Sequence, residues 1–271
     1  MRIGIMLRTL GEQGGIGVYS RHLTSELLAL DRQNDYVLFY RNPEHAGRFA
    51  HFPNVVERVV RAPNKLLWDQ ASMPLAGRRE RLDVLLHPKF SVPLAAPYKT
   101  VMVLHGAGWF MPSYQRYWKP QDLAYARLMM PLYCRRAASV LSVSKLTTEI
   151  FHQRFNLPKG KIRTVYFGPG RDFRPVQEPE RLQQVRQKYR LPEHFIFSLS
   201  GYDRGPRKNI EGLLATYRLL HGRVPHQLIV GGRGCERFRK DFDIPNSGYG
   251  ADILFPGWIE QEDLPVFYTL A

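Results

Sequence analysis

Residues 201–214 read GYDRGPRKNIEGLL, a turn rich in glycine and cations that joins two regular elements of different kinds. The apolar run before it, residues 195–199, predicts a buried parallel strand. The apolar residues at its end and beyond recur at the spacing of one helix face: Ile210, Leu213, Leu214, Tyr217 and Leu220. A strand, a short turn and a helix in this order form the repeating unit of an open α/β sheet.

The turn itself has the chemistry of an anion site. A helix that begins after a strand presents its unpaired N–H groups and the positive end of its dipole to the turn. Gly201 allows a close approach of the backbone, and Arg204, Arg207 and Lys208 add positive charge and hydrogen-bond donors. The residues leave two interpretations open: a grip for the diphosphate of a nucleotide-sugar, and a solvated basic turn.

The same alternation of strands and helices runs through the chain. Strands are predicted at residues 2–7, 36–40, 55–60, 84–86, 100–104, 140–143, 162–165, 195–199, 227–230 and 252–255. Helices are predicted at residues 18–30, 65–81 with an interruption near Pro74, 121–136, 145–155, 179–189, 209–220 and 261–271. This pattern predicts an α/β doubly wound fold with parallel sheets covered on both faces. Residues 167–179, with three prolines and two glycines, predict a linker, so we expect domains at 1–170 and 171–271.

Positive charge is concentrated in the first part of the chain. Residues 1–175 carry 26 Lys and Arg against 12 Asp and Glu, whereas residues 176–271 carry 13 against 12. This asymmetry favours a polyanionic partner such as an anionic membrane surface or a phosphorylated acceptor. A basic composition inherited from an Arg-rich genome is the alternative. Nucleic acid is not expected as a partner, because no nucleic-acid-binding signature stands out.

Cysteine spacing and hydropathy indicate the cellular compartment. Cys134 and Cys235 stand far apart and form no metal or redox motif. We see no signal peptide and no apolar run near the ~20 residues of a membrane span. We therefore expect a cytoplasmic protein, placed peripherally at the inner face of the membrane if the acceptor is bound there.

Two further sites follow predicted strands. GEQGGIG, residues 11–17, joins the first strand to the first helix, and Gly14, Gly15 and Gly17 allow close approach of a ligand to a helix N-terminus. Its spacing is not that of the dinucleotide fingerprint, and a plain turn is the alternative. His105 ends the run TVMVLH, at the sheet edge where α/β proteins bind ligands. A packed histidine is the alternative there.

An aromatic segment also carries cations. It consists of Trp109, Phe110, Met111, Tyr114, Tyr117 and Trp118 with Arg116 and Lys119. Rings interleaved with cations are typical of a membrane interface, although a loop folded onto the core gives the same composition. No Ser-His-Asp, HExxH or DxD motif was identified as a catalytic or metal site, so we expect no metal ion.

Seven segments, taken in order, resemble glycosyltransferase family 4, the retaining transferases of GT-B fold. They include its bacterial mannosyl- and glucosyl-transferase pattern, and they read GGIGVYSRHL; LLWDQASMPL with LDVLLHPKFSVP; VMVLHGAGWF; VLSVSKLTTEIF; VYFGPGRDFRP; GYDRGPRKNI; and FPGWIEQEDLPVFYTLA. Gly106 stands where the family usually has Asp. The turn after Tyr202 is one residue longer than in some members, so Arg204 and Arg207 are both candidates for the family arginine.

The resemblance implies two Rossmann-like domains facing a cleft, the first on the acceptor side and the second binding the nucleotide-sugar. It implies transfer of a hexose from GDP-mannose or a UDP-sugar to a glycan or lipid-linked acceptor in cell-envelope polysaccharide synthesis, without a cofactor. Lys208, with Arg207 or Arg204, would stabilise the departing diphosphate, and Gly201 would line its turn. Backbone N–H groups at Gly14, Gly15 or Gly17 would approach the phosphates, and His105 would bind a sugar hydroxyl.

The resemblance also implies an incomplete donor site. The family continues with an acidic E-G-F-G-like segment that contacts the donor, and this chain ends at Ala271, before that segment. We therefore expect a C-terminally truncated second domain and a chain inactive in sugar transfer. Two alternatives stay open: a non-catalytic fragment that binds a nucleotide-sugar or a polyanion, and another GT-B enzyme such as a nucleotide-sugar epimerase.

Overall fold

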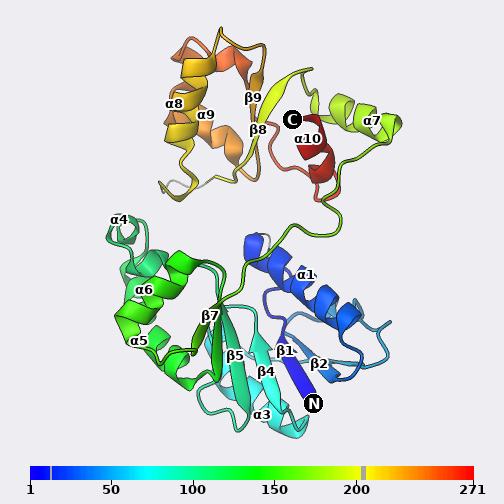
Figure 1. Cartoon of the computed structure of the whole chain (residues 1–271), viewed down its shortest axis with the longest axis vertical. Coiled ribbons are helices and arrows are strands. Elements are labelled where there is room, and N and C mark those ends of the chain that lie inside the picture. Colours follow the sequence, from blue (N-terminus) through cyan, green and yellow to red (C-terminus); the bar gives the residue numbers. More distant parts are fainter. Residues whose placement is uncertain (13, 203–205) are drawn as a thin grey trace. The chain divides into compact units, whose positions relative to one another are not determined.

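The computed structural model describes residues 1–12, 14–202 and 206–271, which divide into two compact units, Met1–Phe167 and Gly168–Ala271. Each unit is a parallel sheet with helices packed on it, as the alternation of strands and helices predicts (Figure 1). The boundary lies three residues before the predicted one at residue 170. We describe the two units separately as the N-terminal and the C-terminal unit.

The N-terminal unit is built on a parallel sheet of seven strands in the order β3-β2-β1-β4-β5-β6-β7. Their bounds are Arg2–Met6 (β1), Asp35–Tyr40 (β2), Val55–Val59 (β3), Val84–His87 (β4), Lys99–Leu104 (β5), Ser139–Ser142 (β6) and Ile162–Thr164 (β7). The chain winds outward from β1 to β3 and then returns to place β4 beside β1. This reversal between β1 and β4 is the position at which open α/β sheets bind ligands.

The helices of this unit are α1 (Gly15–Leu30), α2 (Lys65–Leu67), α3 (Met73–Arg79), α4 (Pro112–Gln115), α5 (Pro120–Arg136) and α6 (Lys145–Phe155). A π-helical turn, Trp68–Ser72, joins α2 to α3. The interruption predicted near Pro74 therefore lies before that proline. Pro74 occupies the first turn of α3, where its missing N–H does not break the hydrogen-bond ladder.

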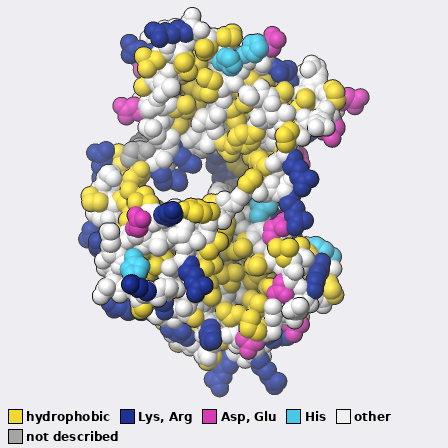
Figure 2. Space-filling view, viewed as in Figure 1, with side chains coloured by type: hydrophobic (Ala, Val, Ile, Leu, Met, Phe, Trp, Pro, Cys, Tyr) yellow, Lys and Arg dark blue, Asp and Glu magenta, His cyan; other side chains and the backbone are white. Residues whose placement is uncertain are grey.

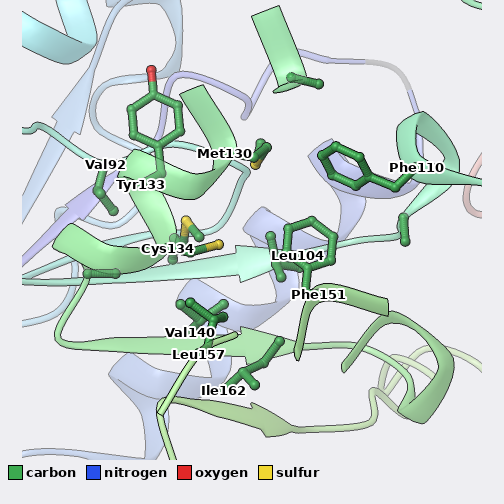
Figure 3. Close-up of a cluster of buried hydrophobic side chains, with 14 residues drawn as sticks. Val92, Leu104, Phe110, Met130, Tyr133, Cys134, Val140, Phe151, Leu157 and Ile162 are labelled. Carbon is green, nitrogen blue, oxygen red and sulfur yellow. The ribbon is translucent and has the colours of Figure 1, made fainter. Parts of the chain in front are cut away.

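Alternate residues of the central strands pack against helices on opposite faces of the sheet. Met6, Val37 and Phe39 form a core with Trp68 and Met73 of the 65–79 helical segment. Their neighbours along the strands form a second core against α1: Ile5, Leu7, Leu38 and Tyr40 with Leu28. A third cluster joins β5, β6 and β7 to α5 and α6 (Figure 3). Burial on both faces explains the nearly continuous apolar strands.

The C-terminal unit has a three-stranded parallel sheet in the order β10-β9-β8, with β8 at Phe195–Leu199, β9 at Gln227–Gly231 and β10 at Ile253–Leu254. Its helices are α7 (Pro179–Tyr189), α8 (Ile210–Leu220), α9 (Phe238–Asp241) and α10 (Leu264–Leu270). One core lies between the sheet and α8 and α9, and another lies between the sheet and α7 and α10. The unit is thus also covered on both faces.

Candidate functional site

The loops after β8 and β9 are joined along their backbones in the C-terminal unit. The Ser200 N–H donates to the Gly231 carbonyl at 2.6 Å, and the Tyr202 N–H donates to the Arg233 carbonyl at 2.8 Å. Gly232 has φ +130°, and a Cβ there would lie 2.6 Å from the Gly201 nitrogen. Gly232 therefore allows the two loops to approach closely at the carboxyl edge of the sheet, whereas a Cβ on Gly201 would make only an ordinary contact, 3.5 Å from the Arg233 carbonyl oxygen.

The predicted cations lie at the start of α8. Arg207 and Lys208 are exposed and belong to the short 3₁₀ turn Pro206–Lys208, whereas Arg204 lies outside the described residues. Asn209, the N-cap of α8, has a left-handed backbone and its side chain makes no capping hydrogen bond. In the part of the chain that the structure describes, Asn209 therefore does not cap the first backbone donors of α8, which is an arrangement that suits a bound anion.

Arg233 and Trp258 are candidates that the sequence reasoning missed. Arg233 is exposed and directly follows Gly231 and Gly232 at the end of β9. Its guanidinium carbon lies 5.5 Å from the centre of the Trp258 ring, which is 48% exposed. The signal was present in the sequence, because GGRG at residues 231–234 is a glycine and arginine turn after a strand, like the turn at Gly201.

The three predicted glycines of the N-terminal unit have different surroundings. Gly14 is the N-cap of α1 and has no side chain to cap it, and among the described residues the first turn of α1 has no acidic residue. A Cβ on Gly14 or Gly15 would meet nothing within 4 Å, so the backbone there is open to a ligand. A Cβ on Gly17 would instead collide with the backbone carbonyl of Glu12. Gly17 is therefore required for packing of the loop against α1, and any role in binding stays a prediction.

His105 follows β5 and is packed among aromatic rings. Its Nε2 atom lies 2.9 Å from the Pro88 carbonyl, so Nε2 carries the proton and donates to that oxygen. The ring contacts Tyr19 edge-on, with centroids 4.8 Å apart, and lies near Phe90 and Phe167. Burial lowers the pKa of His105 and outweighs the opposing hydrogen bond to Pro88, while Lys89 lowers it further. A neutral imidazole results, with Nδ1 as an acceptor for a hydroxyl group.

A buried polar network that the sequence reasoning missed lies at the topological reversal between β1 and β4. Arg8 binds Asp69 of the π turn through two hydrogen bonds, Nε to Oδ1 at 3.0 Å and one terminal nitrogen to Oδ2 at 3.2 Å. The Ser91 hydroxyl donates to Asp69 Oδ2 at 2.7 Å. His87 Nδ1 donates to the Ser91 carbonyl at 2.7 Å, and burial lowers the pKa of His87 to about 4.

The π turn also explains the segment WDQ. The Trp68 indole N–H donates to the Val60 carbonyl, and Gln70 bonds the backbone of Val92 and Leu94 on the loop after β4. Three consecutive side chains thus each contact a different part of the unit. These contacts join the helical segment to the carboxyl edge of the sheet, so this part of the family pattern has a structural role here.

The aromatic segment divides between the core and the surface. Phe110 is buried and packs edge-on against Phe151 of α6. Trp109 lies against Trp118, with ring centroids 5.3 Å apart, while Tyr117 and Trp118 are 43% and 38% exposed. Each of the two interpretations of this segment therefore fits part of it.

Comparison with known proteins identifies the family. The sequence profile described as Glycosyltransferase Family 4 matches residues 13–169, more than half of the chain. This chain belongs to glycosyltransferase family 4.

Two curated relatives of this family 4 chain are from Escherichia coli. O-antigen chain mannosyltransferase B is 25% identical over 277 aligned residues, which cover 95% of this chain and 71% of that protein. Serotype-specific mannosyltransferase WbdA is 26% identical over 186 residues, which cover 64% of this chain and 22% of WbdA. The chain thus matches less than a quarter of the length of WbdA.

The fold is shared with a solved structure. HepE from Anabaena, in complex with UDP-glucose, superposes with a TM-score of 0.67 at 16% identity, covering 98% of this chain and 71% of HepE. The predicted GT-B class is therefore confirmed. The roles of His105, Arg207, Lys208 and the glycines stay predictions.

Proposed function

We propose that this family 4 chain contributes to retaining transfer of a hexose from a nucleotide-diphosphate sugar to a glycan or lipid-linked acceptor in envelope polysaccharide synthesis. The names of both E. coli relatives, which are mannosyltransferases, support mannose as the sugar. The presence of UDP-glucose in HepE supports a nucleotide-sugar donor. GDP-mannose and a UDP-sugar are the two donors to test first.

The start of α8 carries this proposal. Arg207 and Lys208 precede a helix whose N-cap residue, Asn209, makes no capping hydrogen bond among the described residues, beside the joined loops after β8 and β9. When the bond between sugar and diphosphate breaks, negative charge develops on the leaving diphosphate. Fixed cations and backbone donors stabilise that charge more than they stabilise the bound donor, which lowers the barrier. Arg204 belongs to the same turn and stays a candidate for the arginine that assists Lys208.

The N-terminal unit would supply groups that orient the sugar. The neutral His105 presents Nδ1 as an acceptor for a sugar hydroxyl, since Nε2 is already bound to Pro88. The open backbone at Gly14 and Gly15 gives α1 an uncapped N-terminus for a phosphate oxygen. In this proposal His105 binds and positions the donor sugar, and the glycine loop adds donors for the diphosphate.

Calorimetric titration with GDP and UDP tests the donor site. Lys208→Ala should weaken binding of the preferred nucleotide about tenfold or more, because a hydrogen bond to a charged group contributes about 1.5–3 kcal/mol. Lys159→Ala, an exposed lysine of the N-terminal unit, is the matched control and should leave binding unchanged. Equal affinity of wild type and Lys208→Ala for both nucleotides would remove Lys208 from the site.

We propose that the N-terminal unit binds an anionic membrane surface, where it would reach a lipid-linked acceptor. Large apolar side chains are exposed along α5 and the turn before it: Tyr117, Trp118, Tyr125, Leu128 and Leu132. Cations Arg116, Lys119 and Arg127 accompany them, and Lys and Arg side chains are spread over the face of the N-terminal unit visible in the lower half of Figure 2. Among the described residues, no helix is long and apolar enough to cross a membrane.

Vesicle co-sedimentation tests this docking. We expect binding to phosphatidylglycerol-containing vesicles that weakens with salt, because surface charge attraction is screened beyond about 10 Å at 0.1 M salt. Leu128→Ser should reduce binding, whereas Leu219→Ser, equally exposed on α8 of the C-terminal unit, should not. Binding that ignores both salt and Leu128 would argue against this surface.

A further inference from the structure

Three neighbouring strands of the N-terminal unit each lead into an arginine. Arg8 follows β1, Arg41 follows β2 and Arg61 follows β3 within two residues of the strand ends. The strands are adjacent and parallel, with Met6 beside Phe39 and Tyr40 beside Val59. Their carboxyl ends therefore bring the three arginines to one edge of the sheet.

The surface at this edge is hollowed. One pocket of about 530 Å³ is lined by Arg8, Arg41 and Lys65 together with Gly11, Glu12 and the turn at residues 42–45. A second hollow of about 530 Å³ is lined by Arg41 and Arg61. Arg41 lines both, so we treat Arg8, Arg41, Arg61 and Lys65 as one basic groove. Each hollow has a volume in the range of ~300–1,000 Å³ that is typical of small-molecule sites.

Two carboxylates near the groove already have an ion-pair partner, and one of these partners is Arg8 of the groove itself. Asp69 is bound by Arg8, and Glu12 is bound by Lys89, whose Nζ lies 2.6 and 2.7 Å from the two carboxylate oxygens. Glu44 remains on the rim, where it accepts from the Asn42 side chain.

The remaining cations of the groove are available to a ligand. Across residues 1–12, 14–202 and 206–271, Arg41, Arg61 and Lys65 have no carboxylate partner within salt-bridge distance. Two carboxylates line the groove, Glu44 and the Lys89-paired Glu12. Against them stand the positive charges of Arg41, Arg61 and Lys65, so the groove favours an anion.

Two contacts fix the walls of the groove. Asp69 holds the Arg8 guanidinium in place with two hydrogen bonds, and both side chains are less than a tenth exposed. On the other side the His45 ring lies against Gly11, where a Cβ would collide with Nε2. A guanidinium held by a buried carboxylate is preorganised, so it loses little side-chain freedom when an anion binds.

We propose that the basic groove binds a phosphate group carried by the acceptor. An arginine can bind phosphate oxygens in a planar, bidentate manner. Arg41, Arg61 and Lys65 supply the donors, and Arg8, held by Asp69, adds positive charge beside them. That the bound phosphate belongs to the acceptor rests on the proposed function, whereas the phosphate site itself does not. It gives the acceptor a chemical class: a phosphorylated glycan or the phosphate headgroup of a lipid carrier.

Calorimetry on the whole chain tests the groove with glycerol 3-phosphate as the probe and glycerol as the uncharged control. The variant Arg41→Gln/Arg61→Gln removes two charges, and in the described part of the chain neither side chain makes an ion pair whose loss would destabilise the unit. Arg79→Gln, exposed at the end of α3 toward the opposite edge of the sheet, is the matched control. A second arm uses phosphatidylcholine vesicles with and without phosphatidic acid.

We expect wild type and Arg79→Gln to bind the ester, and the double variant to bind it at least tenfold more weakly with unchanged GDP or UDP affinity. Vesicle binding that requires phosphatidic acid and Arg41, without binding of the soluble ester, would assign the phosphate to a lipid headgroup. Loss of ester binding in Lys208→Ala but not in the double variant would overturn the proposal, as would absence of binding in both arms. Ester binding without any nucleotide binding would refute the proposed function and leave the phosphate site standing.

Discussion

The buried pair of Arg8 and Asp69 gives the sharpest test of the structure. The two side chains are 7% and 6% exposed, and Asp69 also accepts from the Ser91 hydroxyl at 2.7 Å. Asp69→Ala leaves a buried guanidinium without its counter-charge and a buried hydroxyl without its acceptor. Breaking a buried pair on one side costs about 3–5 kcal/mol, so we expect the free energy of unfolding of the N-terminal unit to fall by about that amount.

A surface pair of the same unit provides the comparison. Arg58 binds Glu80 with its side chain 49% exposed. Arg58→Ala should cost no more than about 1 kcal/mol, because solvent screens an exposed pair. Removing both buried charges, in Arg8→Met/Asp69→Leu, should recover much of the stability lost in Asp69→Ala, since no uncompensated charge remains.

Urea unfolding followed by tryptophan fluorescence measures these differences, because the fully buried Trp68 precedes Asp69 and reports on this unit. Circular dichroism of each variant confirms that the folded state is retained before unfolding. If Asp69→Ala lost no more stability than Arg58→Ala, the pair would not be buried as the structure has it. Failure of the double variant to recover stability would show that the hydrogen bonds, not the charge imbalance, dominate.

Three further predictions follow from other buried contacts. Burial lowers the pKa of His87 to about 4, so the unfolded state takes up this proton before the folded state does as the pH falls. The free energy of unfolding should therefore drop by about 3 kcal/mol between pH ~6.5 and ~4. For His87→Gln, the urea midpoint should change less with pH. Gly17→Ala should cost about 1–3 kcal/mol by overpacking, whereas Gly15→Ala, with open space around it, should leave the melting temperature unchanged or higher. Asp263→Asn should destabilise the C-terminal unit by about 1–3 kcal/mol, because this buried carboxylate accepts hydrogen bonds from Lys188 and Tyr189 at 2.8 Å. Equal urea midpoints of wild type and Asp263→Asn would show that these hydrogen bonds do not stabilise the unit.

The sheet architecture could be predicted because its signals are local. Apolar runs such as residues 195–199 mark strands whatever lies around them, and the structure begins and ends β8 at the predicted residues. The predicted burial is wrong for most of β8, because it is an edge strand in which only Phe195 is buried. The π turn at Trp68–Ser72 could not be predicted in this way. Its wide turn is held by contacts of Trp68, Asp69 and Gln70 to distant segments, whereas the local sequence shows only Pro74 as a break.

In the candidate site too, features with a local sequence signal could be predicted, whereas features that depend on tertiary contacts could not. Glycine and cation turns after strands are local, so the turn at Gly201 was found from the sequence, and the turn at Gly232 follows the same rule. The difference between Gly14 and Gly17 depends on which backbone lies opposite, and the sequence does not contain that information. The pairing of Arg8 with Asp69, 61 residues apart, likewise depends on the tertiary fold.

The separation of the hydrophobic cores has a consequence for recombination. The three clusters of the N-terminal unit draw only on residues before Phe167, and the two clusters of the C-terminal unit only on residues after Gly168. A crossover between these two residues cuts through none of those clusters. Chimeras that join residues 1–167 to the corresponding second half of another family member should therefore keep all five clusters intact, so that the two halves can be exchanged independently.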